Sequence, residues 1–349
     1  MALIPTTILT GFLGAGKTTL LNRILREPHG YKIAVIENEF GQENIDNEIL
    51  LQDSNEQIVE MSNGCICCTI RGDLVLALGS LAQKRNAGEL DFDRVVIETT
   101  GLANPGPVAQ TFFMDDEVAT HYLLDAIVTV VDARHAMQQL DEHEEAQRQV
   151  GFADKLLLSK TDLVAAEELE TLTDRLKRIN PRAPAGKVHF GQAPIAEVLD
   201  LRGFNLNDKL EIDPDFLAAE EHGHHECDDD CGHDHGGQDH PHHNHHHAHH
   251  SDEIAAFTFK SDRPFDSGKL DEMLGSLVQV YGPRMLRYKG VLWMSGADRK
   301  VVFQGVHQMM GSDLGAKWAE GEARGSKVVF IGKNLPKETF IRGLEQCLV

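Results

Sequence analysis

The sequence contains no apolar run that approaches the roughly 18 residues needed to cross a membrane. It opens with MALIP and passes directly into an apolar stretch, without the basic and long apolar segments of a secretory signal peptide. Its six cysteines fall into groups of three, two and one, unlike the disulfide framework of a secreted protein. We therefore expect a cytoplasmic protein with reduced thiols and no membrane partner.

Basic residues are scarce. The chain has 33 Lys and Arg against 55 Asp and Glu, a net charge of −22 at pH 7. This balance argues against attraction to nucleic acid or to an anionic membrane. Much of the negative charge is local, because the stretch from Glu211 to Glu253 has 13 acidic residues and no basic ones. Apolar residues make up 41% of the 349, enough for a core, and the length suggests two domains.

The segment Gly11–Thr18, GFLGAGKT, fits the phosphate-binding pattern G-x-x-x-x-G-K-[ST]. An apolar pair precedes it and leucines at helical spacing follow, which predicts strand, glycine loop and helix and disfavours a chance glycine-rich turn. Backbone N–H groups would hold a polyphosphate, with Lys17 on its β and γ oxygens and the Thr18 hydroxyl on Mg²⁺. The predicted loop contacts are Gly11, Gly14, Ala15, Gly16, Lys17 and Thr18.

Six further apolar runs end in polar residues, and helical patterns separate most of them. Alternating strands and helices with continuous apolar strands predict an α/β fold with a doubly wound, mostly parallel sheet. Function is expected at the carboxyl ends of its strands. The predicted strands lie within Tyr31–Gly41, Gln57–Cys68, Arg94–Gly101, Ala126–Ala133, Lys155–Asp162 and Gly186–Phe190, with a helix from about Asp73.

Two of these strand ends offer a carboxylate for the Mg²⁺ that accompanies a nucleotide. In IETTG, Glu98 is placed to bind the ion or its waters, and the Gly101 N–H to meet a γ-phosphate. Asp132, in VVDA, is the alternative carboxylate. We favour Glu98, because a glycine three residues later suits a segment that must approach phosphate.

The tetrapeptide SKTD, Ser159–Asp162, follows a buried strand where a P-loop fold holds the base. Asp162 would accept hydrogen bonds from N1–H and the exocyclic amino group of guanine, a donor pair that adenine lacks. The stem of Lys160 would lie along the base. An ordinary polar strand end is the alternative, but the position favours GTP over ATP.

The motif GCICC places Cys65, Cys67 and Cys68 just before a predicted helix. A helix N-terminus favours the thiolate, and the adjacent pair is poorly suited to a disulfide. Two or three thiolates would bind a soft or borderline cation, with Glu37 from the preceding strand as an oxygen ligand. Buried small apolar residues are the alternative.

The composition changes near Asp213. From His222 to His250 the chain has 13 histidines in 29 residues, mixed with Asp, Gly, Cys227 and Cys231. Such a tract cannot bury a core and is expected to be disordered without a ligand. Its neutral imidazoles predict a multisite, unselective trap for Zn²⁺, Ni²⁺, Co²⁺ and Cu²⁺, with an inert spacer as the alternative. The other six histidines are assigned no role.

From Ile254 the patterns predict a small α+β domain. Four strand-like runs, IAAFTFK, YKGVLWM, KVVFQGVHQ and SKVVFIG, are accompanied by two helical patterns, SGKLDEMLGSLVQVYG and KETFIRGLEQCLV. The predicted division is a nucleotide domain over 1–212, the histidine- and aspartate-rich linker over 213–252, and the α+β domain over 253–349.

Several segments together resemble the CobW-like P-loop GTPases, relatives of the urease and hydrogenase nickel-insertion GTPases. They are TGFLGAGKTTLLNRIL, IENEFG, NGCICC, VIETTGLANPGPV and the late YKGVLW, FQGVH and VVFIG. The resemblance covers almost the whole chain outside the histidine tract. It implies a GTP-binding domain, a CobW-type C-terminal domain, slow GTP hydrolysis, and handling of zinc, cobalt or nickel.

Carried over by residue, the resemblance extends the nucleotide loop to Thr19 and makes Glu98–Gly101 the Walker-B-like stretch. It assigns the metal motif to Cys65, Cys67 and Cys68. In the family the guanine motif usually begins with Asn, whereas this chain has Ser159. A hydroxyl makes fewer hydrogen bonds than an amide, which predicts softer nucleotide affinity or selectivity.

The sequence thus predicts a GTPase that couples nucleotide state to metal binding, as a metallochaperone or metal-insertase for a client metalloprotein. GTP, Mg²⁺ and Zn²⁺ (or Co²⁺ or Ni²⁺) are its expected ligands, and Lys17, Thr18 and Glu98 carry the catalytic roles. A nucleotide- or metal-dependent homo-oligomer is compatible with this prediction. The alternatives are a metal storage or buffering protein and a small-molecule kinase; the guanine motif and the lack of an acceptor-site signature disfavour the kinase.

Overall fold

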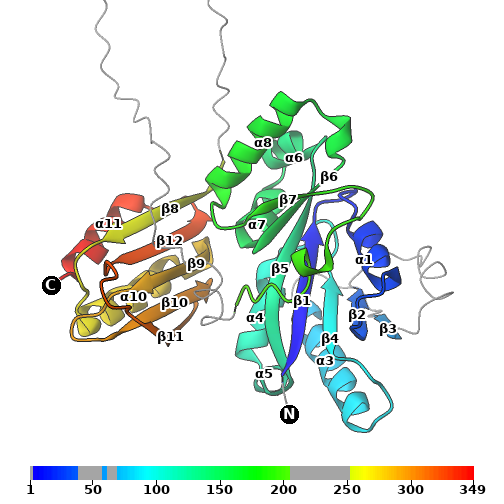
Figure 1. Ribbon diagram of the computed structural model, residues 1–349, viewed down its shortest axis with the longest axis horizontal. Helices are drawn as coiled ribbons and strands as arrows, with labels where there is room; N and C mark the ends of the chain where they lie inside the picture. Colours follow the sequence, from blue (N-terminus) through cyan, green and yellow to red (C-terminus); the bar gives the residue numbers. More distant parts are fainter. Residues whose placement is uncertain (1–2, 38–56, 61–68, 205–251) are drawn as a thin grey trace, which may run out of the picture.

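Two β-sheets, one from each part of the chain, form the framework of the computed structural model (Figure 1). The structure describes residues 3–37, 57–60, 69–204 and 252–349. The predicted histidine tract lies outside these residues. Within the described residues, no helix is both long and apolar enough to span a membrane.

The first sheet has seven strands in the order β3-β2-β4-β1-β5-β6-β7, and every neighbouring pair is parallel. Its central strands are buried on both faces, as continuous apolar runs require. This confirms the predicted α/β class. The strands are β1 Ile4–Gly11, β2 Ile33–Glu37, β3 Gln57–Glu60, β4 Arg94–Glu98, β5 Tyr122–Asp132, β6 Lys155–Ser159 and β7 Ala185–Val188.

Helices cover both faces of this sheet, unequally. Helix α1, Lys17–Arg26, packs on one face together with residues 193–199. The other helices cover the opposite face. They are α3 Thr69–Asn86, α4 Pro105–Met114, α5 Asp116–His121, α6 Ala136–Glu142, α7 Glu144–Phe152 and α8 Ala166–Ile179. The 3-10 turn η1 Thr161–Leu163 follows β6, and η2 Ile195–Glu197 lies on the α1 face. Helix α3 begins a few residues before the predicted start at Asp73.

The second sheet is antiparallel, with five strands in the order β11-β10-β9-β12-β8. Helices α10 and α11 cover one of its faces around a second apolar core. This sheet and its helices confirm the predicted α+β architecture. The elements are β8 Ile254–Ser261, α10 Ser267–Tyr281, η4 Gly282–Arg284, β9 Met285–Leu292, β10 Arg299–Val306, β11 Met309–Lys317, β12 Ser326–Lys333 and α11 Lys337–Gln346.

Strand β11 was not among the predicted strands. Its sequence, MMGSDLGAK, has two glycines and few apolar residues, and most of its side chains are exposed. It forms because it pairs along its length with β10 after a tight turn at His307, whose φ is 52°. Backbone hydrogen bonds to a neighbouring strand hold this edge strand, without the alternating apolar pattern that sequence reading detects.

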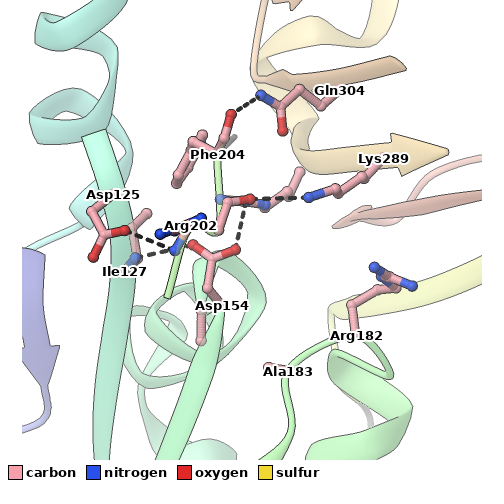
Figure 2. Close-up of polar contacts among 12 residues, drawn as sticks. Asp125, Ile127, Asp154, Arg182, Ala183, Arg202, Phe204, Lys289 and Gln304 are labelled. Atoms are coloured by element: carbon pink, nitrogen blue, oxygen red, sulfur yellow. Dashed lines mark hydrogen bonds and ion pairs between the residues drawn. The ribbon is translucent and has the colours of Figure 1, made fainter. Parts of the chain in front are cut away.

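The two parts meet through the face of the second sheet that α10 and α11 leave uncovered. Leu286, Val329 and Ile331 join the same apolar cluster as Val150 and Phe152 of α7. A buried ion pair adds a polar link, since Arg287 Nη2 lies 2.7 Å from Asp154 Oδ1. Figure 2 shows the surrounding contacts, in which Lys289 and Gln304 donate to the carbonyls of Gly203 and Phe204 at 3.0 and 2.8 Å.

Candidate nucleotide and metal site

The glycine loop between β1 and α1 has the conformation that a phosphate cradle needs. At Gly11 a Cβ would lie 2.3 Å from the Val130 carbonyl of β5, so only glycine fits against that strand. Gly16 precedes α1 with a φ of 98°, and the first turn of α1 contains no acidic residue. The loop therefore presents the positive end of the α1 dipole to an anion.

Thr18 and Glu98 come together beside this loop. The Thr18 hydroxyl donates to Glu98 Oε1 at 2.8 Å, although the two residues lie on α1 and at the end of β4. Glu98 is 8% exposed. A hydroxyl and a carboxylate side by side are the oxygen donors that Mg²⁺ prefers, so these residues fit the ion. The contact favours Glu98 as the metal carboxylate.

Asp132, the alternative carboxylate, is engaged elsewhere. Its Oδ2 lies 2.7 Å from Lys160 Nζ and 2.9 Å from His135 Nδ1. Burial pushes the pKa of Asp132 up, but the hydrogen bonds and charges of Lys160 and His135 outweigh burial, and the pKa falls below its ordinary value. Asp132 is thus held ionised to anchor Lys160.

The segment after Glu98 lies against the glycine loop. A Cβ on Gly101 would lie 2.7 Å from the backbone nitrogen of Leu13. From behind, the buried amide of Gln149 on α7 donates to the carbonyls of Gly101 and Ala103 at 3.0 and 3.1 Å. The Gly101 segment is therefore supported on one side by α7 and contacts the phosphate-binding loop on the other.

The SKTD residues surround the outer side of the same loop. Ser159 Oγ donates to the Ala15 carbonyl at 2.7 Å, and Lys160 Nζ donates to the Gly14 carbonyl at 2.8 Å. Asp162 is 47% exposed at the end of this segment. Its Oδ1 lies 3.5 Å from Nδ1 of His189, which follows β7. Ser159 thus connects the SKTD segment to the glycine loop through its hydroxyl.

The predicted metal ligands are described only in part. Half-buried Glu37 ends β2 and pairs in register with Glu98 on β4 and with Glu60 on β3. The cysteines of the GCICC motif lie outside the described residues, between the end of β3 and the start of α3 at Thr69. Among the described side chains no group of three potential ligands is close enough to hold a metal ion. Of the predicted metal ligands, Glu37 therefore lies within the described residues, at the same sheet edge as Glu98.

The sequence of this fold matches one family over both of its parts. Residues 5–186 match the nucleotide-binding domain described as CobW/HypB/UreG, and residues 254–348 match the cobalamin synthesis protein cobW C-terminal domain. The chain belongs to the CobW family. The predicted family and fold are confirmed.

One relative matches this chain almost completely, and another matches just over half of it. The zinc chaperone YjiA of Escherichia coli K12 is 40% identical over 335 residues, 96% of each chain. The zinc-regulated GTPase metalloprotein activator 1 of Schizosaccharomyces pombe is 41% identical over 208 residues, 58% of this chain and 50% of that protein. The crystal structure of Zn(II)-bound YjiA GTPase from E. coli matches with a TM-score of 0.76 and 34% identity over 100% of both chains.

Two side chains at the site of this CobW-family chain were missed by sequence reasoning. Gln149 lies on an amphipathic helix, and nothing in the sequence around it predicts that its amide contacts Gly101. His189 was one of the six histidines without an assigned role. Its position directly after a predicted short strand was the available signal, because strand ends gather at the functional edge.

Proposed function

We propose that this chain is a GTP-hydrolysing metallochaperone that couples its nucleotide state to the binding of zinc, or of cobalt or nickel. The observation that carries the proposal is the pairing of Glu37 with Glu98 on neighbouring parallel strands. One carboxylate belongs to the predicted metal site and the other to the predicted Mg²⁺ site. The zinc chaperone and GTPase names of its relatives support the same function.

The reaction is phosphoryl transfer from GTP to water. Lys17 and the loop N–H groups would bind the phosphates. Thr18 and Glu98 would hold Mg²⁺, which would supply positive charge to offset the negative charge that develops on the phosphates. The Gly101 N–H approaches the γ-phosphate, while Lys160 and Asp162 hold the guanine base. Thr19 and Ser159 complete the nucleotide contacts, as the family resemblance implies.

The metal site combines Glu37 with Cys65, Cys67 and Cys68, whose thiolates suit zinc better than a hard cation. Binding of GTP at Glu98 and Gly101 would alter the position of Glu37 on the adjacent strand, and with it the ligand set. The coupling must be reciprocal, so GTP and metal change each other's affinity by the same factor. The metal is then delivered to a client metalloprotein.

A metal titration in two nucleotide states tests this coupling. Zn²⁺ affinity of the full chain, and of a chain lacking Glu221–Ser251, is measured with GDP and with a non-hydrolysable GTP analogue. We expect affinities that differ by about 5- to 150-fold. Joint substitution Cys67→Ser and Cys68→Ser should remove the coupled site, whereas Cys347→Ser, at the buried cysteine of the second domain, should leave it. Equal affinities in both nucleotide states would instead favour metal storage or buffering.

The histidine tract is proposed to collect metal for this site. Deleting Glu221–Ser251 should lower the number of bound metal ions but leave GTP hydrolysis unchanged, because a tract of this composition contributes little to a core. A deletion protein that keeps its full metal count would identify the tract as a spacer.

A further inference from the structure

The turn after β7 places His189 beside the candidate guanine carboxylate, Asp162, with Phe190 as the next residue. The chain reverses there, with the Gln192 N–H donating to the His189 carbonyl at 2.9 Å. The imidazole of His189 lies 3.5 Å from Asp162 Oδ1 and meets the ring of Phe190 edge to face at 4.5 Å. His189 and Phe190 therefore lie at the same end of the sheet as Asp162.

Gly191 fixes this turn against α1. Its φ is +74°, and a Cβ would lie 2.8 Å from the Thr19 carbonyl and 3.1 Å from Leu20 Cα. Thr19 is in the first turn of α1, directly after Lys17 and Thr18. The turn over residues 189–191 is therefore seated on the part of α1 that follows the phosphate cradle, where the sugar and base of a bound nucleotide would lie.

Phe190 has a strained conformation that burial among the described residues does not explain. Its φ is 46°, in the left-handed region that is unfavourable for a bulky residue. The residue is 77% exposed, so burial of the ring does not offset that cost. Backbone strain of this kind clusters at active sites and ligand-binding positions.

Lys160 lies in the loop after β6, on the same segment as Asp162. It too has a left-handed backbone, with a φ of 56°, and its Nζ is held by the Gly14 carbonyl and by Asp132. With its ammonium group tied down, the aliphatic stem of Lys160 is held in the segment that carries Asp162 two residues later. The loops after β6 and β7 thus bring Lys160 and Asp162 together with His189 and its neighbour Phe190.

We propose that Phe190 stacks on the base of the bound nucleotide and, with the stem of Lys160, encloses the guanine that Asp162 selects. This inference rests on the proposed GTP-binding function. It assigns affinity for the base and selectivity for guanine to different residues. Stacking on an aromatic ring contributes affinity with little regard to the base, because every base has a π-face. Asp162 reads the hydrogen-bonding edge, so Phe190 sets affinity and Asp162 sets selectivity.

The test measures dissociation constants of the full chain for GDP, for IDP, which lacks the exocyclic amino group, and for tripolyphosphate, which lacks a base. Phe190→Ala should weaken GDP and IDP by the same factor, about 5- to 150-fold, and leave tripolyphosphate unchanged. Asp162→Asn should instead reduce the preference for GDP over IDP. Phe113→Ala, at another exposed aromatic residue on α4, is the matched control and should change none of the three.

A tryptophan variant adds a direct readout of stacking. Phe190→Trp should restore GDP affinity, and its emission should be quenched by GDP but not by tripolyphosphate. Phe113→Trp should show no such quenching, and the two native tryptophans, Trp293 and Trp318, lie in the second domain. A wild type that binds GDP while Phe190→Ala binds it within twofold would overturn the stacking role alone. A wild type that binds GDP no better than tripolyphosphate would overturn the proposed GTP-binding function itself.

Discussion

Replacing Gly101 with alanine should slow GTP hydrolysis, because the Gly101 segment touches the phosphate-binding loop through its Cα. The added Cβ would lie 2.6 Å from Leu13 Cδ2 and 2.7 Å from both Leu13 Cγ and the Leu13 backbone nitrogen. The exposed leucine side chain can rotate away, but the backbone nitrogen cannot. Gly101 is not among the residues with positive φ, so alanine fits its backbone conformation and the variant reports the steric conflict alone.

The size of the effect follows from the cost of forcing one extra carbon into a packed contact, about 1–3 kcal/mol. If the segment moves away from the loop to relieve that cost, kcat/KM for GTP should fall by about 5- to 150-fold. The loss should be larger for a non-hydrolysable GTP analogue than for GDP, because the Gly101 N–H is proposed to meet the γ-phosphate.

Steady-state hydrolysis and binding of the two nucleotides measure this prediction. Gly275→Ala is the matched control, since that glycine lies within α10 and a Cβ there would meet nothing within 4 Å. It should leave hydrolysis unchanged and stabilise the fold by about 0.5–1 kcal/mol. A kcat/KM for Gly101→Ala within twofold of the wild type would refute the reasoning. Equal losses of affinity for GDP and the GTP analogue would indicate that the substitution disturbs the phosphate-binding loop and not a contact with the γ-phosphate.

Three further substitutions test contacts described above. Thr18→Ala should make hydrolysis insensitive to added Mg²⁺, and an unchanged Mg²⁺ titration curve would count against the Thr18–Glu98 site. Asp132→Asn should flatten the acid side of the stability profile. Because the pKa of Asp132 is lowered in the folded state, its ionised carboxylate stabilises the fold at pH values above its ordinary pKa of about 4. This contribution is lost as pH falls below about 4. Urea unfolding between about pH 3 and 6 should therefore separate the two proteins. Arg287→Leu should cost about 3–5 kcal/mol of unfolding free energy by leaving Asp154 buried without its cation, and adding Asp154→Asn should recover part of the loss.

Much of the candidate nucleotide edge could be predicted because several parallel strands end in the residues proposed to act there. Glu98 and Gly101 follow one apolar run and Ser159–Asp162 another, and the rule that carboxyl ends share an edge brings them together. The preference for Glu98 over Asp132 came from the spacing of a glycine, and the Thr18–Glu98 contact now supports it.

Contacts made across the sequence could not be predicted in the same way. Nothing in the sequence around Gln149 says that its amide supports the Gly101 segment, since the contact depends on how α7 lies against the sheet. The pairing of Arg287 with Asp154 depends likewise on the packing between two domains. Strand β11 has no periodic burial, so only its hydrogen-bonding partner reveals it.

The apolar cluster shared by α7 and the second sheet has a consequence for how a newly made chain matures. Val150 and Phe152 belong to the nucleotide-binding part, yet Leu286, Val329 and Ile331 complete their packing from positions close to the C-terminus. While the chain leaves the ribosome, the outer surface of α7 stays uncovered until the last strands have been synthesised. An intermediate with exposed apolar surface is prone to aggregate. Any lesion that delays or truncates the second sheet therefore endangers the nucleotide-binding part as well.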